Sequence, residues 1–158
     1  MTASDALQAA ARAVLAANRR QGRSAWGDRE YDFVCPSGAA YPFQWFWDSC
    51  FHAIALTHVD PNLAEQELRG LFQAAQPSGF IPHMILWERA AHEAVLATYN
   101  VSFGAEFTTA TIQPPVLAQA VERVWLAGAN PTFLEEALPV VQAYHAWLAA
   151  NRDPTVAG

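Results

Sequence analysis

The stretch Phe46-Trp-Asp-Ser-Cys-Phe-His-Ala-Ile-Ala-Leu-Thr-His-Val-Asp-Pro61 predicts one helix and the turn that leads into the next. Phe51, Ile54 and Ala55 recur at the spacing of one helix face, which indicates a helix over about residues 46–57. Asp60 can cap a second helix, and Pro61 can occupy its first turn, where an N–H is not needed. Two helices joined by so short a turn are expected to pack as an antiparallel hairpin.

The same reasoning extends along the whole chain. Apolar spacing predicts helices over residues 5–20, 61–75 and 115–127, the first with Leu7, Ala11, Val14 and Leu15 on its inner face. After Asn130 we expect a short helical turn and then a helix over 138–151, because Pro139 would remove a hydrogen bond from a helix interior. Residues 21–44 and 80–87 show no sustained period, although 81–86 could form a strand. The fold class is therefore all-α, built from helical hairpins in one domain.

Composition narrows the possible partners. The 158 residues carry a net charge of −6 with 15 acidic and nine basic residues, so no basic surface for nucleic acid is expected. All the basic residues are arginine, which indicates a GC-rich bacterial source. No apolar run is long enough to span a membrane and the first residues lack a secretion signal, so a cytoplasmic location is expected. The histidines and the two cysteines, Cys35 and Cys50, show no zinc spacing, and no phosphate or dinucleotide loop occurs; we expect no metal and no cofactor.

The segment Tyr41-Pro-Phe-Gln-Trp-Phe-Trp-Asp48 is the most informative for function. It combines aromatic rings, which can stack on the apolar faces of sugars, with Gln44 and Asp48, which can bind pairs of hydroxyl groups. An equally weighted alternative is that Asp48 caps or otherwise supports the helix that follows. His83, between Pro82 and Met84 in an irregular segment, is a further candidate for sugar contact. His52 and His145 are expected to be packed helix residues.

Four pieces of the sequence carry a resemblance to a known family. They are Trp-Phe-Trp-Asp-Ser-Cys-Phe-His-Ala-Ile-Ala-Leu at 45–56, Gly-Phe-Ile-Pro-His-Met at 79–84, Thr-Ile-Gln-Pro-Pro-Val at 111–116 and Tyr-His-Ala-Trp-Leu-Ala-Ala-Asn-Arg-Asp at 144–153. In this order they resemble the N-terminal part of glycoside hydrolase family 63, and within it the bacterial glucosylglycerate and mannosylglycerate hydrolases.

The resemblance implies an (α/α)6 barrel that hydrolyses an α-glycosidic bond in a small glycoside with inversion. Tyr41, Trp45, Trp47, Asp48 and Gln113 match family positions that contact the non-reducing sugar. Together with Gln44 and His83, they form the predicted substrate-binding set. The expected partner is therefore a small sugar or glycoside.

The chain does not contain the family's catalytic carboxylates. A barrel of this kind needs twelve helices, whereas the sequence predicts about five, so residues 1–158 are expected to form a partial barrel domain. The family's general acid lies in a Trp-Glu-Ser-Gly-x-Asp-Asn-Ser-like stretch and its general base in a later glutamate, and neither motif occurs here. We do not expect Asp48, Glu88, Glu93 or Glu106 to replace them as an acid and base pair. The isolated chain is expected to bind sugar at best weakly and to have no catalytic residue of its own.

Two other functions fit the pattern. The hairpins could form a protein-interaction module in which the aromatic segment is buried between helices. Alternatively, the same barrel could belong to a sugar epimerase, a trehalase or a debranching enzyme. An open concave surface that contains Trp45, Trp47, Asp48 and Gln113 would favour sugar binding over the module. A partial barrel should also expose apolar helix faces, which predicts self-association.

Overall fold

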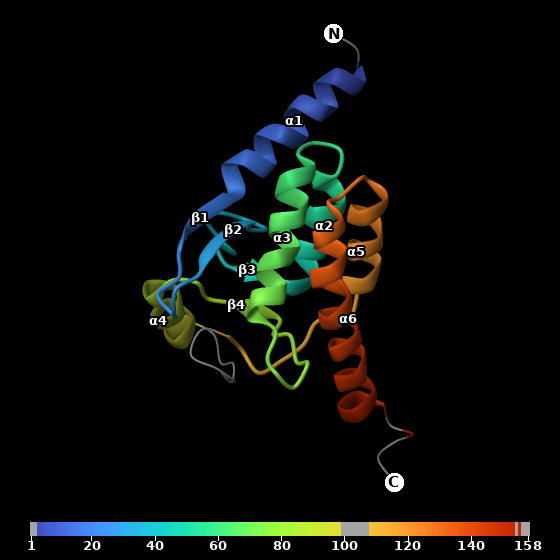
Figure 1. Cartoon of the computed structure of the whole chain (residues 1–158). Helices are drawn as coiled ribbons and strands as arrows, with labels where there is room; N and C mark the ends of the chain where they lie inside the picture. The colour runs from blue at the N-terminus through green and yellow to red at the C-terminus, as the bar shows by residue number, and fades with distance from the viewer. Residues whose placement is uncertain (1–2, 99–107, 154, 156–158) are drawn as a thin grey trace.

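The computed structural model describes residues 3–98, 108–153 and 155. Helices α2, α3, α5 and α6 pack side by side and form the body of the molecule (Figure 1). Helix α1 projects from one end of this body, and α4 lies at its side beside the strands (Figure 1). The helices are α1 Ala3–Asn18, α2 Phe46–Leu56, α3 Pro61–Ala74, α4 Arg89–Thr98, α5 Leu117–Leu126 and α6 Pro131–Arg152.

The predicted hairpin of α2 and α3 is confirmed. Asp60 has extended backbone angles and its side chain accepts a hydrogen bond from the Leu63 amide at 3.1 Å, while Pro61 opens the helix. Phe51, which lies on the helix face that indicated α2 in the sequence, is 50% exposed. The face that packs on α3 instead carries Ser49, Cys50 and Ala53, all fully buried, because small side chains let the two helices approach closely.

Four short strands interrupt the helical pattern, so an all-α class is not confirmed. Strand β1 (Arg19–Arg23) pairs antiparallel with β2 (Glu30–Val34), and β3 (Gln44–Trp45) pairs antiparallel with β4 (Met84–Ile85). The expectation of an irregular segment over residues 21–44 was therefore wrong in part, because it contains all of β2 and parts of β1 and β3. In β2, Tyr31 and Phe33 are buried while Asp32 binds Arg19, an alternation too short to stand out in the sequence. Strand β4 lies within the predicted 81–86 segment.

The predicted break at Pro139 was wrong, because α6 continues through it. Proline cannot donate the backbone hydrogen bond that the carbonyl of residue 135 would accept. Glu135 and Pro139 both lie on the exposed side of α6, where water can satisfy that carbonyl. Phe133, Ala137 and Tyr144 lie on either side of the proline and are all fully buried, so packing of one helix face holds the two halves together.

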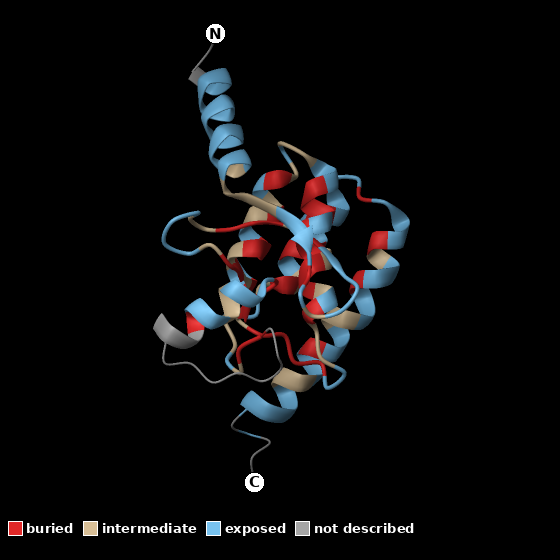
Figure 2. Cartoon of the chain, turned by 90° about the vertical axis from the view of Figure 1, so that its left-hand side faces the viewer, coloured by how far each residue is buried: buried red, intermediate tan, exposed pale blue. Residues whose placement is uncertain are grey.

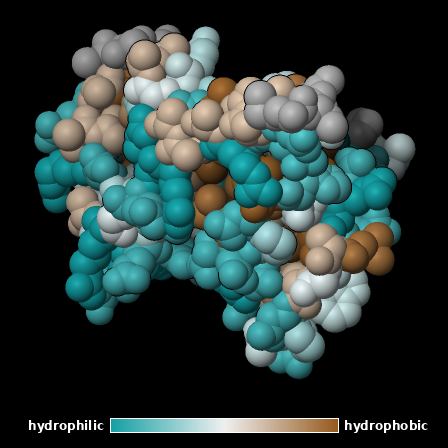
Figure 3. All heavy atoms as spheres, turned by 90° about the horizontal axis from the view of Figure 1, so that it is seen from above, coloured by the Kyte–Doolittle hydropathy of each residue, from teal (hydrophilic) through white to brown (hydrophobic). Residues whose placement is uncertain are grey.

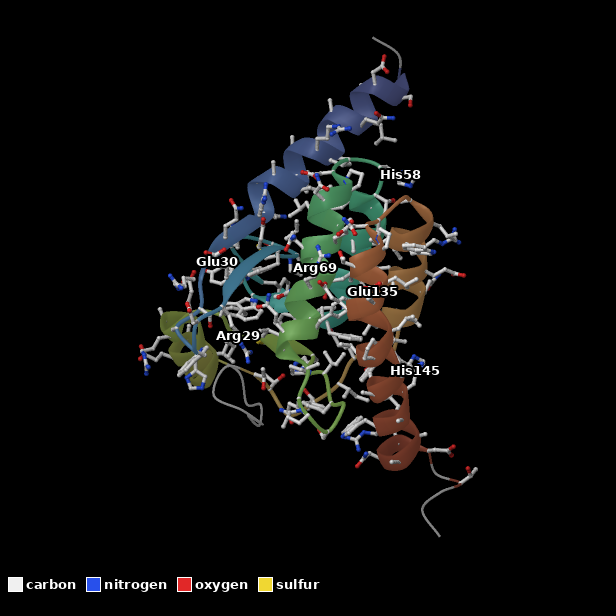
Figure 4. All side chains as sticks on the ribbon, viewed as in Figure 1. Arg29, Glu30, His58, Arg69, Glu135 and His145 are labelled. Atoms are coloured by element: carbon white, nitrogen blue, oxygen red, sulfur yellow. The ribbon has the colours of Figure 1, made fainter. Side chains whose placement is uncertain are left out.

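Three further residues, in α6 and α1, are more exposed than the sequence suggested. His145 is not packed but projects from α6 towards solvent (Figure 4). Helix α1 is almost entirely exposed (Figure 2), and its Leu7 and Val14, predicted to face inward, are 73% and 60% exposed. Helix α1 is attached mainly at its C-terminal end, where Leu15 packs on the core and the chain continues into β1. Most of the predicted inner face of α1 is thus left uncovered.

The Asp60 cap gives a test of the hairpin. Replacing Asp60 by Ala should lower the free energy of unfolding by about 1 kcal/mol, because the Leu63 amide loses its acceptor at the start of α3. Chemical denaturation followed by circular dichroism measures this change. Asp60→Asn retains an acceptor and is the matched control, which should lose much less stability. Equal losses in both variants would contradict the capping role.

Candidate functional site

Five of the predicted substrate-binding residues meet around one cavity. It has a volume of about 300 Å³ and is open to solvent. We call it the aromatic pocket; it is lined by Pro36, Tyr41, Trp45, Trp47, Asp48 and Gln113. The residues come from the segment before α2, from the first turn of α2 and from the segment before α5, which lie far apart in the sequence.

The N-terminus of α2 explains why these segments meet. The first amides of a helix have no acceptor within the helix, and Trp45 at the N-cap provides no side-chain acceptor. Two distant groups take this role: the Phe46 amide donates to the His83 carbonyl at 3.0 Å, and the Trp47 amide donates to Gln113 Oε1 at 3.0 Å. Asp48 lies in the first turn and does not occupy the N-cap, although its charge there still complements the helix dipole.

Asp48 is held in a partly buried setting. Burial raises the pKa of its carboxyl group, and nearby His52, the Trp47 side chain and the Gln113 side chain oppose this rise. Because Gln113 Oε1 already accepts from the Trp47 amide, the amide N–H of Gln113 is the group that donates to Asp48. Gln113 therefore joins the helix start and the carboxylate, and fixes the direction in which Asp48 can accept hydrogen bonds.

The aromatic rings leave apolar surface available at the pocket. Tyr41 and Trp47 are 49% and 40% exposed, which is high for such large rings. Tyr41 packs edge-on against Trp45 with ring centroids 6.0 Å apart, so Trp45 supports Tyr41 from within. A flat apolar face beside a carboxylate is the combination that recognises a sugar ring.

His83 lies behind this wall and is not part of the pocket lining. Its ring packs edge-on against Trp45 with centroids 5.5 Å apart, and its Nδ1 atom lies 2.5 Å from the hydroxyl groups of Thr109 and Thr111. Burial lowers the pKa of His83, which favours the neutral ring. His83 therefore contributes to the site by supporting Trp45 and, through its carbonyl, the start of α2.

The structure separates Gln44 from the pocket, which corrects the expectation that it contacts sugar. Gln44 is fully buried. Its Oε1 accepts from the Trp87 indole at 2.8 Å, and its Nε2 donates to Ser49 Oγ at 3.2 Å and to the Glu67 carbonyl at 3.1 Å. With these partners its amide is fully engaged in holding β3 against α2 and α3.

The sequence reasoning missed Glu67, which completes this buried group. Its carboxyl accepts from Ser49 Oγ at 2.5 Å and from the Val34 amide at 2.6 Å. A signal was present, because Glu67 follows Leu63 by four residues and precedes Leu71 by four on the buried face of α3. A carboxylate on that face must find hydrogen-bond donors inside the protein.

The other candidate carboxylates do not join Asp48. Glu88 Oε1 accepts from the Tyr31 hydroxyl at 2.5 Å in a separate cavity of about 280 Å³ that is walled by Phe33, Phe43 and Trp87. Glu93 is exposed on α4, and Glu106 lies outside the described residues. Among the residues that the structure describes, no cluster of three metal ligands occurs. None of the described helices is both long enough and apolar enough to cross a membrane.

Comparison with known proteins gives a consistent match. The family model described as the mannosylglycerate hydrolase MGH1-like glycoside hydrolase domain matches residues 41–158. The mannosylglycerate hydrolase of Thermus thermophilus is 35% identical over 132 residues, which are 77% of this chain and 31% of that protein.

Solved structures of the same kind of enzyme also match this chain. The crystal structure of GH63 mannosylglycerate hydrolase from Thermus thermophilus with Tris and D-glycerate superposes with a TM-score of 0.71 at 32% identity, over 94% of this chain and 34% of that one. The same enzyme in complex with glucose gives a TM-score of 0.64 at 32% identity, again over 94% and 34% of the two chains. The chain thus spans about a third of the length of the proteins that it resembles.

Gln113 provides a test of how the site is assembled. Gln113→Ala should raise the pKa of Asp48 further and lower the free energy of unfolding by about 1 kcal/mol, because Asp48 and the Trp47 amide each lose a hydrogen-bond partner. Carboxyl ¹³C NMR titration gives the pKa, and denaturation gives the stability. Gln119→Ala, an exposed site on α5, is the matched control. An unchanged Asp48 pKa in Gln113→Ala would contradict this arrangement.

Proposed function

The chain belongs to the mannosylglycerate hydrolase MGH1-like glycoside hydrolase family, and on that premise we propose that its aromatic pocket binds the sugar ring of a small α-glycoside. Mannosylglycerate and glucosylglycerate are the proposed substrates of the complete enzyme. The observation that carries the proposal is the meeting of Tyr41, Trp47, Asp48 and Gln113 around one open cavity.

The pocket chemistry supports this assignment. The exposed rings of Tyr41 and Trp47 offer apolar surface for the C–H face of a sugar, and Asp48 can accept from two neighbouring hydroxyl groups. Burial raises the pKa of Asp48, while the helix dipole and the hydrogen bond from Gln113 oppose this rise. In its ionised form Asp48 can accept hydrogen bonds from hydroxyl groups of a bound sugar.

The open pocket also favours sugar binding over the protein-interaction module. A protein-interaction module would bury the aromatic segment between helices, whereas Tyr41 and Trp47 are exposed at a cavity that contains a carboxylate. The names of the relatives favour hydrolysis over the epimerase, trehalase and debranching reactions that share the barrel architecture. Hydrolysis with inversion of the α-glycosidic bond is therefore the proposed reaction of the complete enzyme.

We further propose that this chain supplies sugar binding without the chemical step. Inverting hydrolysis needs a general acid and a general base about 6.5 to 9.5 Å apart across the glycosidic bond. The acid and base motifs expected from the family do not occur in the 158 residues, and Glu88 is engaged by Tyr31 in the other cavity. Incubating the purified chain with mannosylglycerate should release no glycerate above the uncatalysed rate, and measurable turnover would contradict this part of the proposal.

Binding can be measured directly. Titration of the chain with mannose, glucose and their glycerate glycosides, followed by the tryptophan indole resonances in NMR, should give weak, saturable binding. Trp47→Ala and Asp48→Asn should each weaken it about tenfold, because each removes roughly 1.4 kcal/mol of stacking or hydrogen bonding. Trp125→Ala, which removes a 37%-exposed ring outside the pocket, is the control. Equal effects of all three substitutions would argue against recognition at this pocket.

Exposed apolar surface supports self-association as a second property. Leu126 on α5 is 70% exposed and lies with Phe51 along a groove between α2 and α5, and Leu7 on α1 is 73% exposed. Hydrophobic surface interrupts the hydrophilic face in Figure 3. Sedimentation velocity should detect concentration-dependent association. Leu126→Gln should reduce it if the copies meet at the groove, and Leu7→Gln should reduce it if they meet at α1. A stable monomer at all concentrations would contradict the expectation.

A further inference from the structure

A buried carboxyl group lies directly behind the aromatic pocket. Glu67 on α3 is fully buried, and its two carboxyl oxygens take hydrogen bonds from two different elements. Oε1 accepts from Ser49 on α2 at 2.5 Å, and Oε2 accepts from the Val34 amide at the end of β2 at 2.6 Å. The backbone carbonyl of Glu67 accepts from Gln44 on β3 at 3.1 Å. One residue therefore joins three separate elements to α3.

Each of these partners is close in sequence to a wall of the pocket. Gln44 directly precedes Trp45, Ser49 directly follows Asp48, and Val34 is two residues before Pro36. A displacement of any partner moves the backbone of its neighbour. The hydrogen bonds to Glu67 thus set how three parts of the lining lie relative to one another, although Glu67 itself does not line the cavity.

We propose that Glu67 is a positioning residue for sugar binding, and that the protonation state of its carboxyl group controls the affinity of the aromatic pocket. The inference rests on the proposed function of that pocket. Glu67 is not among the residues that line the pocket and would act through its hydrogen-bond partners.

The surroundings of Glu67 favour its neutral form. The pKa of Glu67 is raised from 4.5 to about 8, mainly by burial and also by the nearby carboxylates Asp32 and Asp48, while the hydrogen bonds from Ser49 and Val34 oppose the rise. After burial, the negative charge of Glu67 is a further cause that raises the pKa values of the Cys35 and Cys50 thiols. Arg69 lies on the same helix as Glu67, but its guanidinium group forms ion pairs with Glu65 and with Glu136 on α6. Figure 4 labels Arg69 and also Glu135, which precedes Glu136 in α6.

Ionisation of Glu67 would therefore place a buried negative charge beside two existing ones. The folded state holds this proton at pH values where the unfolded chain has lost it, so the free energy of unfolding falls as pH rises from about 4.5 to about 8. As the pH passes 8 the carboxyl ionises in the folded protein, and the network that it shares with Ser49 and Gln44 must rearrange. We expect sugar affinity to fall over the same range.

Two histidines and two cysteines close to this network have pKa values displaced away from this range. Burial lowers the pKa values of His52 and His83 below 6.5 and raises those of Cys35 and Cys50 above 9.0. A transition in binding between pH 7 and pH 9 that disappears when Glu67 is replaced would therefore report on this carboxyl group.

Glu67→Gln is the decisive variant. Glutamine has the same shape and is neutral at every pH, so its side chain can accept from the Val34 amide and donate to Ser49 Oγ. In the unmodified chain, mannose affinity measured by NMR titration should fall about 2-fold to 10-fold between pH 7 and pH 9, the net contribution of one hydrogen bond. In Glu67→Gln the affinity should be the same at both pH values.

Gly70→Ala gives an independent variant that leaves Glu67 unchanged. A Cβ at residue 70 would lie 2.8 Å from Gln44 Nε2, so the Gln44 amide must shift. Affinity should fall at all pH values while the pH transition remains. If Glu67→Gln does not fold, Gly70→Ala still decides the point, because unchanged affinity in Gly70→Ala would overturn the positioning role.

The indole N–H resonances separate failure of this proposal from failure of the proposed function. Trp87, which donates to Gln44, should shift with a midpoint near pH 8 in the unmodified chain and not in Glu67→Gln, while Trp125 on α5 serves as the reference. If this shift occurs but no sugar binds, the binding function fails while control of the network by Glu67 stands. If sugar binds with the same affinity from pH 7 to pH 9, or if Glu67→Gln keeps the transition, the proposal is overturned.

Discussion

The amides at the start of α2 require hydrogen-bond acceptors, and the way the chain supplies them arranges the site. A helix whose N-cap is tryptophan has no side-chain acceptor for its first turn. The His83 carbonyl and the Gln113 side chain fill this need, which places the segments before β4 and α5 against the aromatic segment. The hydrogen bond from the Trp47 amide to Gln113 thus also brings Gln113 beside Asp48. The same contact satisfies the start of α2 and arranges the site.

The buried carboxyl group of Glu67 on α3 imposes a second constraint on the site. Burying Glu67 is unfavourable unless donors surround it, and Ser49 and the Val34 amide provide them. These donors belong to α2 and β2, which apolar packing also holds against α3. Because hydrogen bonds are directional, they fix the positions of α2 and β2 relative to α3 more closely than apolar packing alone. The small residues of α2 that contact α3 permit this, because Ser49, Cys50 and Ala53 let the helices approach closely enough for a hydroxyl group to reach the carboxylate. The same face of α2 therefore allows close packing on α3 and supplies a hydrogen-bond donor to Glu67.

The sequence predicted what local pattern determines and missed what depends on distant partners. Helical spacing and the Asp60-Pro61 turn were sufficient for α2 and α3, since caps and periodicity act within a few residues. The chemistry of the aromatic segment and its resemblance identified five pocket residues. Gln44 was misassigned because an amide beside aromatic rings looks the same in sequence whether it faces a cavity or donates to Glu67 from within. The strand pair β1–β2 and the continuity of α6 at Pro139 likewise depend on tertiary burial of Phe33 and Tyr144.

If the aromatic pocket binds sugar as proposed, binding and chemistry would reside in different parts of the complete enzyme. Holding a sugar ring requires a surface that is complementary to its faces and hydroxyl groups, and the aromatic pocket is the surface proposed for this role. Hydrolysis additionally requires a proton donor and an activated water on opposite sides of one bond. Those groups need only be placed accurately relative to a ring that is already fixed. A wall that orients the substrate can therefore contribute to the rate of such a reaction even when it supplies no acid or base.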